Sequence, residues 1–159
     1  MKAITACTRQ LGIGYQGEMP WHIKEELQLF RQITTGNTVI MGRKTFQSIG
    51  HKELPNRRNI ILTRDMGYDI EYGVECAHSK SSIIDSDDIF IIGGAEIYSL
   101  FLDQITDFYI SFIKSDYKTD TKLSFKPEKV FDDHEVIFEN RHFITYKFFQ
   151  NNRLKGSSI

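Results

Sequence analysis

The stretch IFIIGGAEIYSLFL (residues 89–102) joins two kinds of local structure at a double glycine. Its opening residues, IFII, are apolar and β-branched or aromatic, which predicts a buried strand. After Gly93 and Gly94 comes AEIYSLFL, which we predict to be a helix. A strand that leads directly into a helix is the repeating unit of α/β folds, so this segment favours that fold class.

Similar apolar runs elsewhere in the chain predict further strands. They are AITAC, TVIMG, NIILT, FYISFI, HEVIFE and ITYKFF. Two further helices are expected, KEELQLFRQITTG from Lys24 to Gly36 and the shorter KTFQSIG, which ends at Gly50. Strands and helices alternate up to Leu102 and only strands follow, which predicts an α/β fold with a mostly parallel sheet and an antiparallel end.

Length and composition predict one globular domain over residues 1–159. The chain has 159 residues, of which 40% are hydrophobic and 26% charged, and its net charge is −1. This charge argues against a general nucleic-acid or membrane-surface binder, and no apolar stretch approaches the roughly 18 residues of a membrane span. The two cysteines imply no disulfide framework and favour the cytoplasm. The polar tail, residues 151–159, is expected to fray.

A glycine-rich stretch, GIGYQGEMPW (residues 12–21), matches the spacing G-x-G-x-x-G. A dinucleotide fingerprint also needs a helix that opens at the glycines and an acidic residue after the next strand. Pro20 and Trp21 prevent a helix from running directly out of the glycines, and the next strand is followed by Arg43 and Lys44. We therefore predict a mobile loop here and not a pyrophosphate site.

Gly93 and Gly94 are better placed for a phosphate, because the backbone can approach a ligand there and a helix N-terminus follows. The alternative is a tight strand-to-helix turn without a ligand. Positive charge is also concentrated between residues 43 and 64, where Glu53 is the only acid. The basic residues of this segment are Arg43, Lys44, Lys52, Arg57, Arg58 and Arg64. Several of them follow strands, which suits phosphate binding better than a scattered, solvated surface would.

Glu26 borders an apolar stripe of the first helix. The stripe consists of Ile23, Leu27, Phe30 and Ile33, at the spacing that faces a core. On one interpretation Glu26 is buried with a raised pKa and binds a nitrogenous ring or handles a proton. On the other it lies at the edge of the stripe, where the helix dipole favours an acid. The pattern leaves both open.

The sequence offers no pattern for metal or triad chemistry. It contains no G-x-S-x-G, C-x-x-C or H-x-H motif, and its five histidines are scattered. His22, beside Trp21, is the only histidine near the other candidates, and we interpret it as a loop residue and not as a base. We therefore expect no metal site.

Four motifs together resemble those of the dihydrofolate reductase family. They are GEMPWHIKEELQLFRQIT, VIMGRKTFQSIG, LPNRRNIILT and IIGGAEIY, in the order and at the spacing of that family, and the resemblance runs from Met1 to about Gln150. It implies a three-layer α/β fold in which about four helices flank a central, mostly parallel eight-stranded sheet with an antiparallel C-terminal strand. It also implies an adenosine-binding part at roughly residues 38–88.

The resemblance further implies an activity. This is NADPH-dependent reduction of 7,8-dihydrofolate to 5,6,7,8-tetrahydrofolate, by hydride transfer to pterin C6 and protonation at N5, in support of one-carbon metabolism and thymidylate synthesis. It implies a cytoplasmic monomer whose partners are this small substrate and antifolate inhibitors, with no nucleic acid and no membrane.

Site residues follow from the resemblance position by position. The catalytic residues implied are Glu26, which binds the pterin and promotes protonation at N5, Trp21, and Ser111, which supports the acid. The substrate-binding residues implied are Ile4, Ala6, Met19, Glu26, Leu27, Phe30, Ile49, Leu54, Arg57, Ile92, Tyr98 and Ser111. The cofactor-binding residues implied are Ala6, Ile13, Gly14, Gly42, Arg43, Lys44, Thr45, Leu62, Thr63, Arg64, Ile92, Gly93, Gly94, Ala95, Glu96, Ile97, Tyr98 and Thr121.

Three of these assignments carry specific roles. Arg57 is implied to pair with the α-carboxylate of the glutamate tail. Thr63 and Arg64 fall where the 2′-phosphate of NADPH is bound. The glycine-rich stretch is implied to close over nicotinamide and pterin, with Ile13 and Gly14 touching the cofactor and residues 19–21 flanking the substrate. The family typically has a cis peptide bond at the double glycine.

Three positions depart from the pattern of some members. The acid is a glutamate, Glu26, and not an aspartate, which changes the width of the pocket. Glu96 stands where some members have an arginine that touches phosphate, so here the 2′-phosphate must rely on Arg43 and Arg64. Thr119 stands where some members have a glycine, in a loop that contacts the active-site loop.

Two other functions share parts of this pattern. One is another pterin or pyrimidine reductase on the same fold, such as the riboflavin-pathway reductase, which is not expected to combine the acid at Glu26 with the clamp at Arg57. The other is a non-catalytic folate or nucleotide binder, for which Glu26 and the full cofactor set would be superfluous. Oxidation of NADPH with each substrate in turn separates all three.

Overall fold

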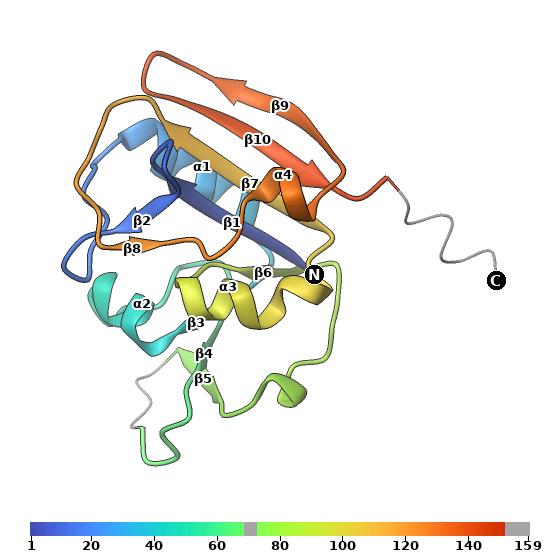
Figure 1. The fold of residues 1–159 in the computed structure, drawn as a ribbon. Coiled ribbons are helices and arrows are strands. Elements are labelled where there is room, and N and C mark those ends of the chain that lie inside the picture. Colours follow the sequence, from blue (N-terminus) through green and yellow to red (C-terminus); the bar gives the residue numbers. More distant parts are fainter. Residues whose placement is uncertain (69–72, 152–159) are drawn as a thin grey trace.

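An eight-stranded sheet forms the centre of the molecule (Figure 1). The structure is a computed structural model and describes residues 1–68 and 73–151. The strand order across the sheet is β5-β4-β3-β6-β1-β7-β10-β9. Every neighbouring pair from β5 to β7 is parallel, and β10 is antiparallel to both β7 and β9. The predicted mostly parallel sheet with an antiparallel C-terminal strand is therefore confirmed.

The strands and helices of the described residues have the following bounds. The strands of the sheet are β1 (Lys2–Cys7), β3 (Thr38–Gly42), β4 (Arg58–Leu62), β5 (Val74–Ala77), β6 (Ile89–Ile91), β7 (Asp107–Ile113), β9 (Asp133–Glu139) and β10 (Phe143–Phe149). A separate two-stranded sheet pairs β2 (Gly12–Gly14) with β8 (Thr121–Lys122). The helices are α1 (Lys24–Thr34), α2 (Arg43–Ser48), α3 (Ala95–Phe101) and α4 (Pro127–Val130), with short 3₁₀ turns η1 (Lys80–Ser82) and η2 (Leu102–Gln104).

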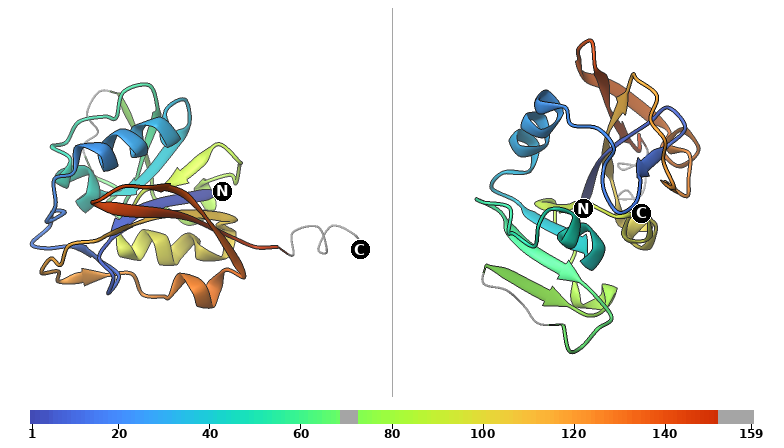
Figure 2. Two further views of the ribbon diagram at one scale, coloured as in Figure 1. Left: turned by 90° about the horizontal axis from the view of Figure 1, so that it is seen from above. Right: turned by 90° about the vertical axis from the view of Figure 1, so that its left-hand side faces the viewer.

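Burial explains why the central strands read as continuous apolar runs. All five residues of β3 and all three of β6 are buried, since helices cover the parallel part of the sheet on both faces. Helix α1 lies on one side of the sheet, and α3 and α4 lie on the other (Figure 2). This is the predicted three-layer arrangement. By contrast, β9 is an edge strand whose residues are almost all exposed.

Several short elements differ from the prediction. The glycine-rich stretch, expected to be a loop throughout, forms strand β2, and Gly12 and Gly14 pair with Lys122 and Thr121. The expectation of strands alone after Leu102 is wrong, because η2 and the four-residue helix α4 follow. Strand β5 was not predicted either. These elements contain only three or four residues, too few for a periodic pattern to show.

Among the described residues, no helix is long and apolar enough to cross a membrane. The first residue of the polar tail, Asn151, donates hydrogen bonds to the carboxylates of Asp132 and Asp133. The rest of the tail that we expected to fray, residues 152–159, lies outside the described residues.

Candidate active site

Glu26 is a buried carboxyl group in the first turn of α1. Its side chain is only 8% exposed, and no ion pair joins it to another described residue. Burial raises its pKa from 4.5 to about 7. Of the two interpretations that the sequence left open, the structure therefore supports the buried acid. A carboxyl group with this pKa exists in both protonation states near neutral pH, as proton transfer requires.

Leu27, the next residue of α1, points away from the core. The stripe predicted it to be buried, but its side chain is 50% exposed. Successive side chains of a helix point about 100° apart. Because α1 buries the side chain of Glu26, the side chain of Leu27 is turned toward the edge of the buried face. Met19, in the preceding loop, is likewise 43% exposed. The approach to the acid thus carries apolar side chains that the protein itself does not cover.

Trp21 is fixed in an apolar cluster on the α1 side of the sheet. Its side chain is 2% exposed and belongs to a cluster with Ala6, Ile23, Ile113 and Phe143. Within the described part of the chain, its indole Nε1 has no hydrogen-bond partner. A buried donor without a partner is uncommon in proteins, and such groups often lie at ligand sites.

Ser111 and Ala6 are side by side on neighbouring strands. Ala6 pairs with Ser111, which in turn pairs with Thr145 of β10. The Ser111 hydroxyl forms a buried hydrogen bond of 2.7 Å with the Thr145 hydroxyl, and no hydrogen bond to Glu26 is found among the described residues. Support of the acid by Ser111 remains a prediction. Sequence reasoning missed Thr145, although a polar residue at a strand position that faces inward is a usable signal.

Part of the predicted apolar wall for the substrate comes together around one cluster, whereas Ala6 belongs to a different cluster and Leu27 is exposed. The members of this part are brought from β1, α1 and the segments that follow α2 and β6. Four partly buried residues pack against the cluster that contains Ile4, namely Phe30, Ile49, Leu54 and Ile92. Residues as far apart in the sequence as Ile4 and Ile92 thus pack together in one apolar cluster.

Arg57 is held by neutral groups at the end of this wall. Its Nη1 donates a 3.0 Å hydrogen bond to the Thr34 hydroxyl and its Nε donates a 2.9 Å bond to the Pro55 carbonyl. The guanidinium lies 5.9 Å from the Phe30 ring. Burial, and then the nearby charge of Arg31, lowers its pKa. No acidic side chain of the described residues forms an ion pair with Arg57, so its charge is available to a ligand carboxylate.

The double glycine forms a narrow cradle with the end of β3. The Gly93–Gly94 peptide bond is cis, as expected, and Gly93 has a φ of 128° that favours glycine. The Gly42 N–H donates a 2.9 Å hydrogen bond to the Gly93 carbonyl. A Cβ on Gly42 would lie 3.1 Å from Ile97 Cγ1, and one on Gly93 would lie 3.5 Å from Thr45 Oγ1. Side chains at these glycines would fill the space over the backbone that a pyrophosphate needs.

Tyr98 fixes this cradle to the centre of the sheet. Its hydroxyl donates a buried 2.6 Å hydrogen bond to the Ile4 carbonyl. Burial is the main reason that its pKa is raised, and the charge of Glu26 also contributes. Gly14 lies against Thr121, whose Cβ would be 3.7 Å from a Cβ on the glycine, so these two predicted cofactor residues also meet.

A second group of cofactor candidates lies at the end of β4. Leu62 is buried there, and the Thr63 hydroxyl accepts a hydrogen bond from the Asp65 N–H. Arg43 Nη1 lies 3.9 Å from a carboxylate oxygen of Asp65. Asp65 directly follows Arg64 in the sequence, so this contact brings Arg43 to the segment that contains Arg64. Five charged residues are exposed around these two groups, namely Arg43, Lys44, Arg64, Asp65 and Glu96.

The family model described as dihydrofolate reductase matches residues 1–153. The chain belongs to the dihydrofolate reductase family. It is an NADP-dependent oxidoreductase that reduces dihydrofolate. The riboflavin-pathway reductase and the non-catalytic binder, which the sequence left open, are not needed to account for the chain.

Relatives agree with this assignment over most of their length. The dihydrofolate reductase of Staphylococcus aureus (strain Mu50 / ATCC 700699) is 39% identical over 137 residues, which cover 86% of this chain and 83% of the relative. That of Haemophilus influenzae is 39% identical over 140 residues, covering 86% and 84%. The solved structure of dihydrofolate reductase from Enterococcus faecalis complexed with NADP(H) and RAB-propyl is similar with a TM-score of 0.80 and 27% identity, covering 94% of this chain and 95% of that chain.

His78 is a residue near the cofactor candidates that sequence reasoning missed. Its Nδ1 lies 2.9 Å from the Thr63 carbonyl oxygen, across the pairing of β4 with β5. The sequence placed only His22 near the site, because β5 was not predicted. In this dihydrofolate reductase an imidazole therefore stands beside the residues expected to bind the 2′-phosphate.

Other basic residues of the predicted positive segment are used differently. Arg58 donates two hydrogen bonds, of 2.6 and 2.9 Å, to the Glu75 carboxylate of β5. This ion pair is exposed and joins two strands at the edge of the sheet. We therefore do not count Arg58 among the ligand-binding cations.

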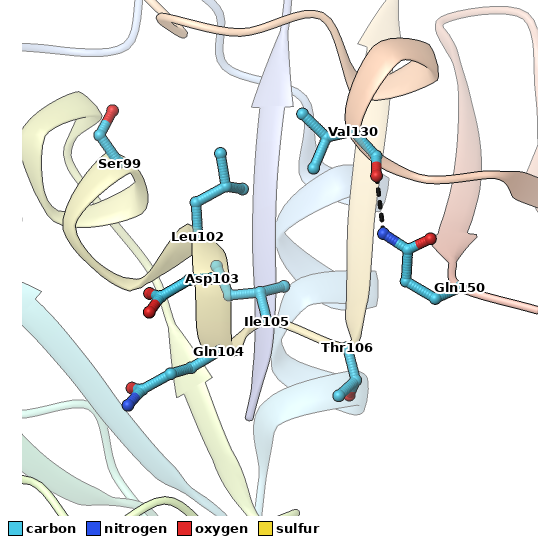
Figure 3. Close-up of a pocket in the computed structure, with 8 residues that line it drawn as sticks. All are labelled: Ser99, Leu102, Asp103, Gln104, Ile105, Thr106, Val130 and Gln150. Carbon is cyan, nitrogen blue, oxygen red and sulfur yellow. Dashed lines mark hydrogen bonds between the residues drawn. The ribbon is translucent and has the colours of Figure 1, made fainter. Parts of the chain in front are cut away.

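One hollow is lined by residues outside the candidate site (Figure 3). It has a volume of about 600 Å³ and lies between the end of α3, the start of β7, α4 and the end of β10. Gln150 closes one side with a 2.6 Å hydrogen bond to the Val130 carbonyl. None of its lining residues is among the predicted site residues. In the described part of the chain, no group of three acidic, histidine or cysteine side chains could hold a metal ion.

Proposed function

We propose that Glu26 is the acid with which this reductase binds the pterin of 7,8-dihydrofolate and promotes protonation at N5. The observation that carries this proposal is a carboxyl group that is 8% exposed, that forms no ion pair with another described residue, and whose pKa is raised to about 7. A buried carboxyl group is costly for the fold unless it meets a ligand that needs it. The amino and ring N–H groups of a pterin are such a ligand.

The reaction needs a hydride and a proton on opposite ends of one double bond. Bound NADPH supplies the hydride, from nicotinamide C4 to pterin C6. Glu26 holds the pterin by its polar edge and keeps a proton available for N5. Trp21 and the exposed apolar side chains of Met19 and Leu27 flank the ring and exclude water from it.

Arg57 binds the α-carboxylate of the substrate's glutamate tail. Thr34 and the Pro55 carbonyl occupy two of its N–H groups and fix the plane of the guanidinium. The remaining N–H groups, which form no hydrogen bond with another described residue, can form a paired contact with a carboxylate. Between Glu26 and Arg57, the aminobenzoyl group lies on the wall formed by Phe30, Ile49 and Leu54.

The cofactor phosphates bind at two places. The cradle of Gly42, Gly93, Gly94 and Thr45 receives the pyrophosphate, because only glycine leaves the backbone open there. The 2′-phosphate is bound by Arg43 at the start of α2 and by Thr63 and Arg64 after β4. Ile13 and Gly14 contact the nicotinamide end when the loop closes.

The protein acts as a cytoplasmic monomer, and antifolate inhibitors compete with dihydrofolate for its site. Its two described cysteines, Cys7 and Cys76, are free, as is usual in a reducing compartment. Every residue assigned above comes from one chain, so no second copy is required. Sedimentation at assay concentration tests the monomer.

The decisive experiment follows NADPH oxidation spectroscopically with 7,8-dihydrofolate and, separately, with the substrate of the riboflavin-pathway reductase. We expect turnover with dihydrofolate alone. The proposal is wrong if the second substrate is reduced faster, or if NADPH and dihydrofolate bind without turnover.

A further inference from the structure

Successive residues of the loop between β7 and β8 contact the glycine-rich stretch (residues 12–21), which we call the active-site loop. Lys118 Nζ lies 5.4 Å from the centre of the Tyr15 ring. Thr119 packs directly against the Cα of Gly12. The Asp120 carboxylate accepts a 2.9 Å hydrogen bond from Gln16 N–H, and the Asp120 N–H donates one of 2.9 Å to Gly14. Three consecutive residues thus hold the part of the loop that faces the cofactor.

The residue before them, Tyr117, contacts the other end of the active-site loop. Its ring meets the Trp21 indole edge to face, with the ring centres 5.7 Å apart and the planes at 66°. Edge-to-face pairs of this kind are favourable beyond the area that they bury. Tyr117 itself is 37% exposed, whereas Trp21 is 2% exposed, so the tyrosine lies over the tryptophan from the solvent side.

Packing alone determines the orientation of the indole. Its Nε1 has no hydrogen-bond partner among the described residues, and its buried neighbours Ala6, Ile23, Ile113 and Phe143 are apolar. Ala6, Ile23 and Ile113 of this cluster are aliphatic, and Phe143 forms no ring pair with Trp21 among the described contacts, whereas an edge-to-face pair has a preferred geometry. In the described structure, Tyr117 supplies the aromatic contact to Trp21.

We infer that Tyr117 is a positioning residue for the reaction, which acts by holding the Trp21 indole against the pterin site. The inference rests on the proposed role of Trp21 beside the substrate. Tyr117 touches neither substrate nor cofactor in this assignment, and its effect passes through the tryptophan. The contact is made by the ring and not by the hydroxyl, so phenylalanine should replace it.

The test compares Tyr117→Ala, Tyr117→Leu and Tyr117→Phe in the full chain, with Lys118→Ala as the matched control. Lys118→Ala removes a neighbouring contact to the same loop but leaves Trp21 covered. NADPH oxidation in a single turnover reports the chemical step, and the fluorescence of Trp21, the only tryptophan of the chain, reports the indole environment. NADPH affinity and the unfolding midpoint are measured in parallel.

We expect Tyr117→Ala and Tyr117→Leu to slow the single turnover about 3- to 10-fold, the range of an aromatic pair. Both should shift the Trp21 emission and leave NADPH affinity unchanged. Tyr117→Phe and Lys118→Ala should retain the parent rate and emission. If Tyr117→Ala fails to fold, Tyr117→Leu, which keeps apolar volume, carries the test.

A parent rate in Tyr117→Leu would overturn the inference, as would a phenylalanine variant as slow as the leucine variant. Equal slowing by Lys118→Ala would also overturn it, because loop anchoring in general would then be responsible. In each of these cases the parent still reduces dihydrofolate, so the proposed function stands. Failure of the parent to turn over dihydrofolate is a different result and contradicts the proposed function itself.

Discussion

Glu26 is placed where the needs of folding and of chemistry oppose each other. Burial raises its pKa from 4.5 to about 7, which disfavours the charged form in the folded protein. The same burial leaves a substantial fraction of the carboxyl groups protonated at neutral pH, which the proposed proton transfer to the pterin requires. A surface glutamate would be fully ionised at that pH and could not donate a proton.

Glu26→Gln should therefore abolish most of the activity. We expect turnover of dihydrofolate at pH 7 to fall roughly 100- to 10,000-fold, the usual size of an acid–base contribution. In the parent, the rate should fall as pH rises through about 7, where the carboxyl group loses its proton, and the variant should lack this decline. Single-turnover rates between pH 5 and 9 measure both. A glutamine variant as fast as the parent at pH 7 would contradict the role.

Arg57 offers a second test at the scale of one side chain. Arg57→Leu removes the proposed partner of the glutamate-tail carboxylate and should raise the Kd of dihydrofolate roughly 10- to 100-fold, as expected for a charged hydrogen-bonded pair. The matched control is Arg58→Leu, because the adjacent arginine is paired with Glu75 instead. Equal weakening by both variants would show that overall charge, and not the clamp, determines affinity.

At the scale of whole elements, the proposed cofactor site lies where strands end. The pyrophosphate cradle joins the ends of β3 and β6, which are neighbours in the sheet, and the candidate 2′-phosphate residues follow β4. Parallel strands bring these ends to one edge of the sheet, although their residues are far apart in the sequence. Arg43, Lys44 and Arg64 follow the ends of β3 and β4, so three cations of a chain with a net charge of −1 lie at this edge.

Arg64 tests this arrangement. Arg64→Ala should weaken NADPH binding roughly 10-fold or more, since one charged hydrogen bond to the 2′-phosphate is lost. NADH, which lacks that phosphate, should bind the variant as well as it binds the parent. Fluorescence titration measures the Kd of each cofactor for the parent and for the variant. Equal weakening of NADPH and NADH would remove Arg64 from the 2′-phosphate site.

Long elements were predictable from the sequence because burial and periodicity are strong there. The central strands and α1 lie where apolar runs and a helical stripe predicted them. The sequence did not determine which side of α1 faces the sheet, because a helix with an acid beside its apolar stripe can be rotated to bury either Glu26 or Leu27. The prediction that Leu27 faces the core was wrong. Strand β5 was missed since VECA alternates too briefly, and His78 was missed with it.

Contacts between segments that are far apart in the chain could not be predicted from the sequence. The hydrogen bond of Ser111 with Thr145 depends on the register of β7 with β10, and the contact of Tyr117 with Trp21 depends on two loops. No local pattern contains either. The motifs shared with the family identified Ser111 and Trp21 as site residues but could not name their partners.

At the scale of the whole molecule, the fold must tolerate one group that destabilises it. In the unfolded chain Glu26 ionises near its ordinary pKa of 4.5, and in the folded protein it ionises near 7. Between these values the folded state binds more protons than the unfolded state, so the free energy of unfolding falls as pH rises. The raised pKa corresponds to roughly 3 kcal/mol of lost stability above pH 7.

Glu26→Gln should remove this loss. Without ligands, we expect the variant to be more stable than the parent by roughly 3 kcal/mol at pH 8, and the difference to shrink toward pH 5, where the parent carboxyl group is protonated in the folded state. Urea unfolding at the two pH values measures it. Glu25→Gln is the matched control, because the neighbouring side chain is exposed and should show no such difference. The outcome that contradicts this prediction is a difference in the free energy of unfolding between variant and parent that does not grow from pH 5 to pH 8. The folded protein would then not raise the pKa of Glu26, and the proposed catalytic role would lose its main support.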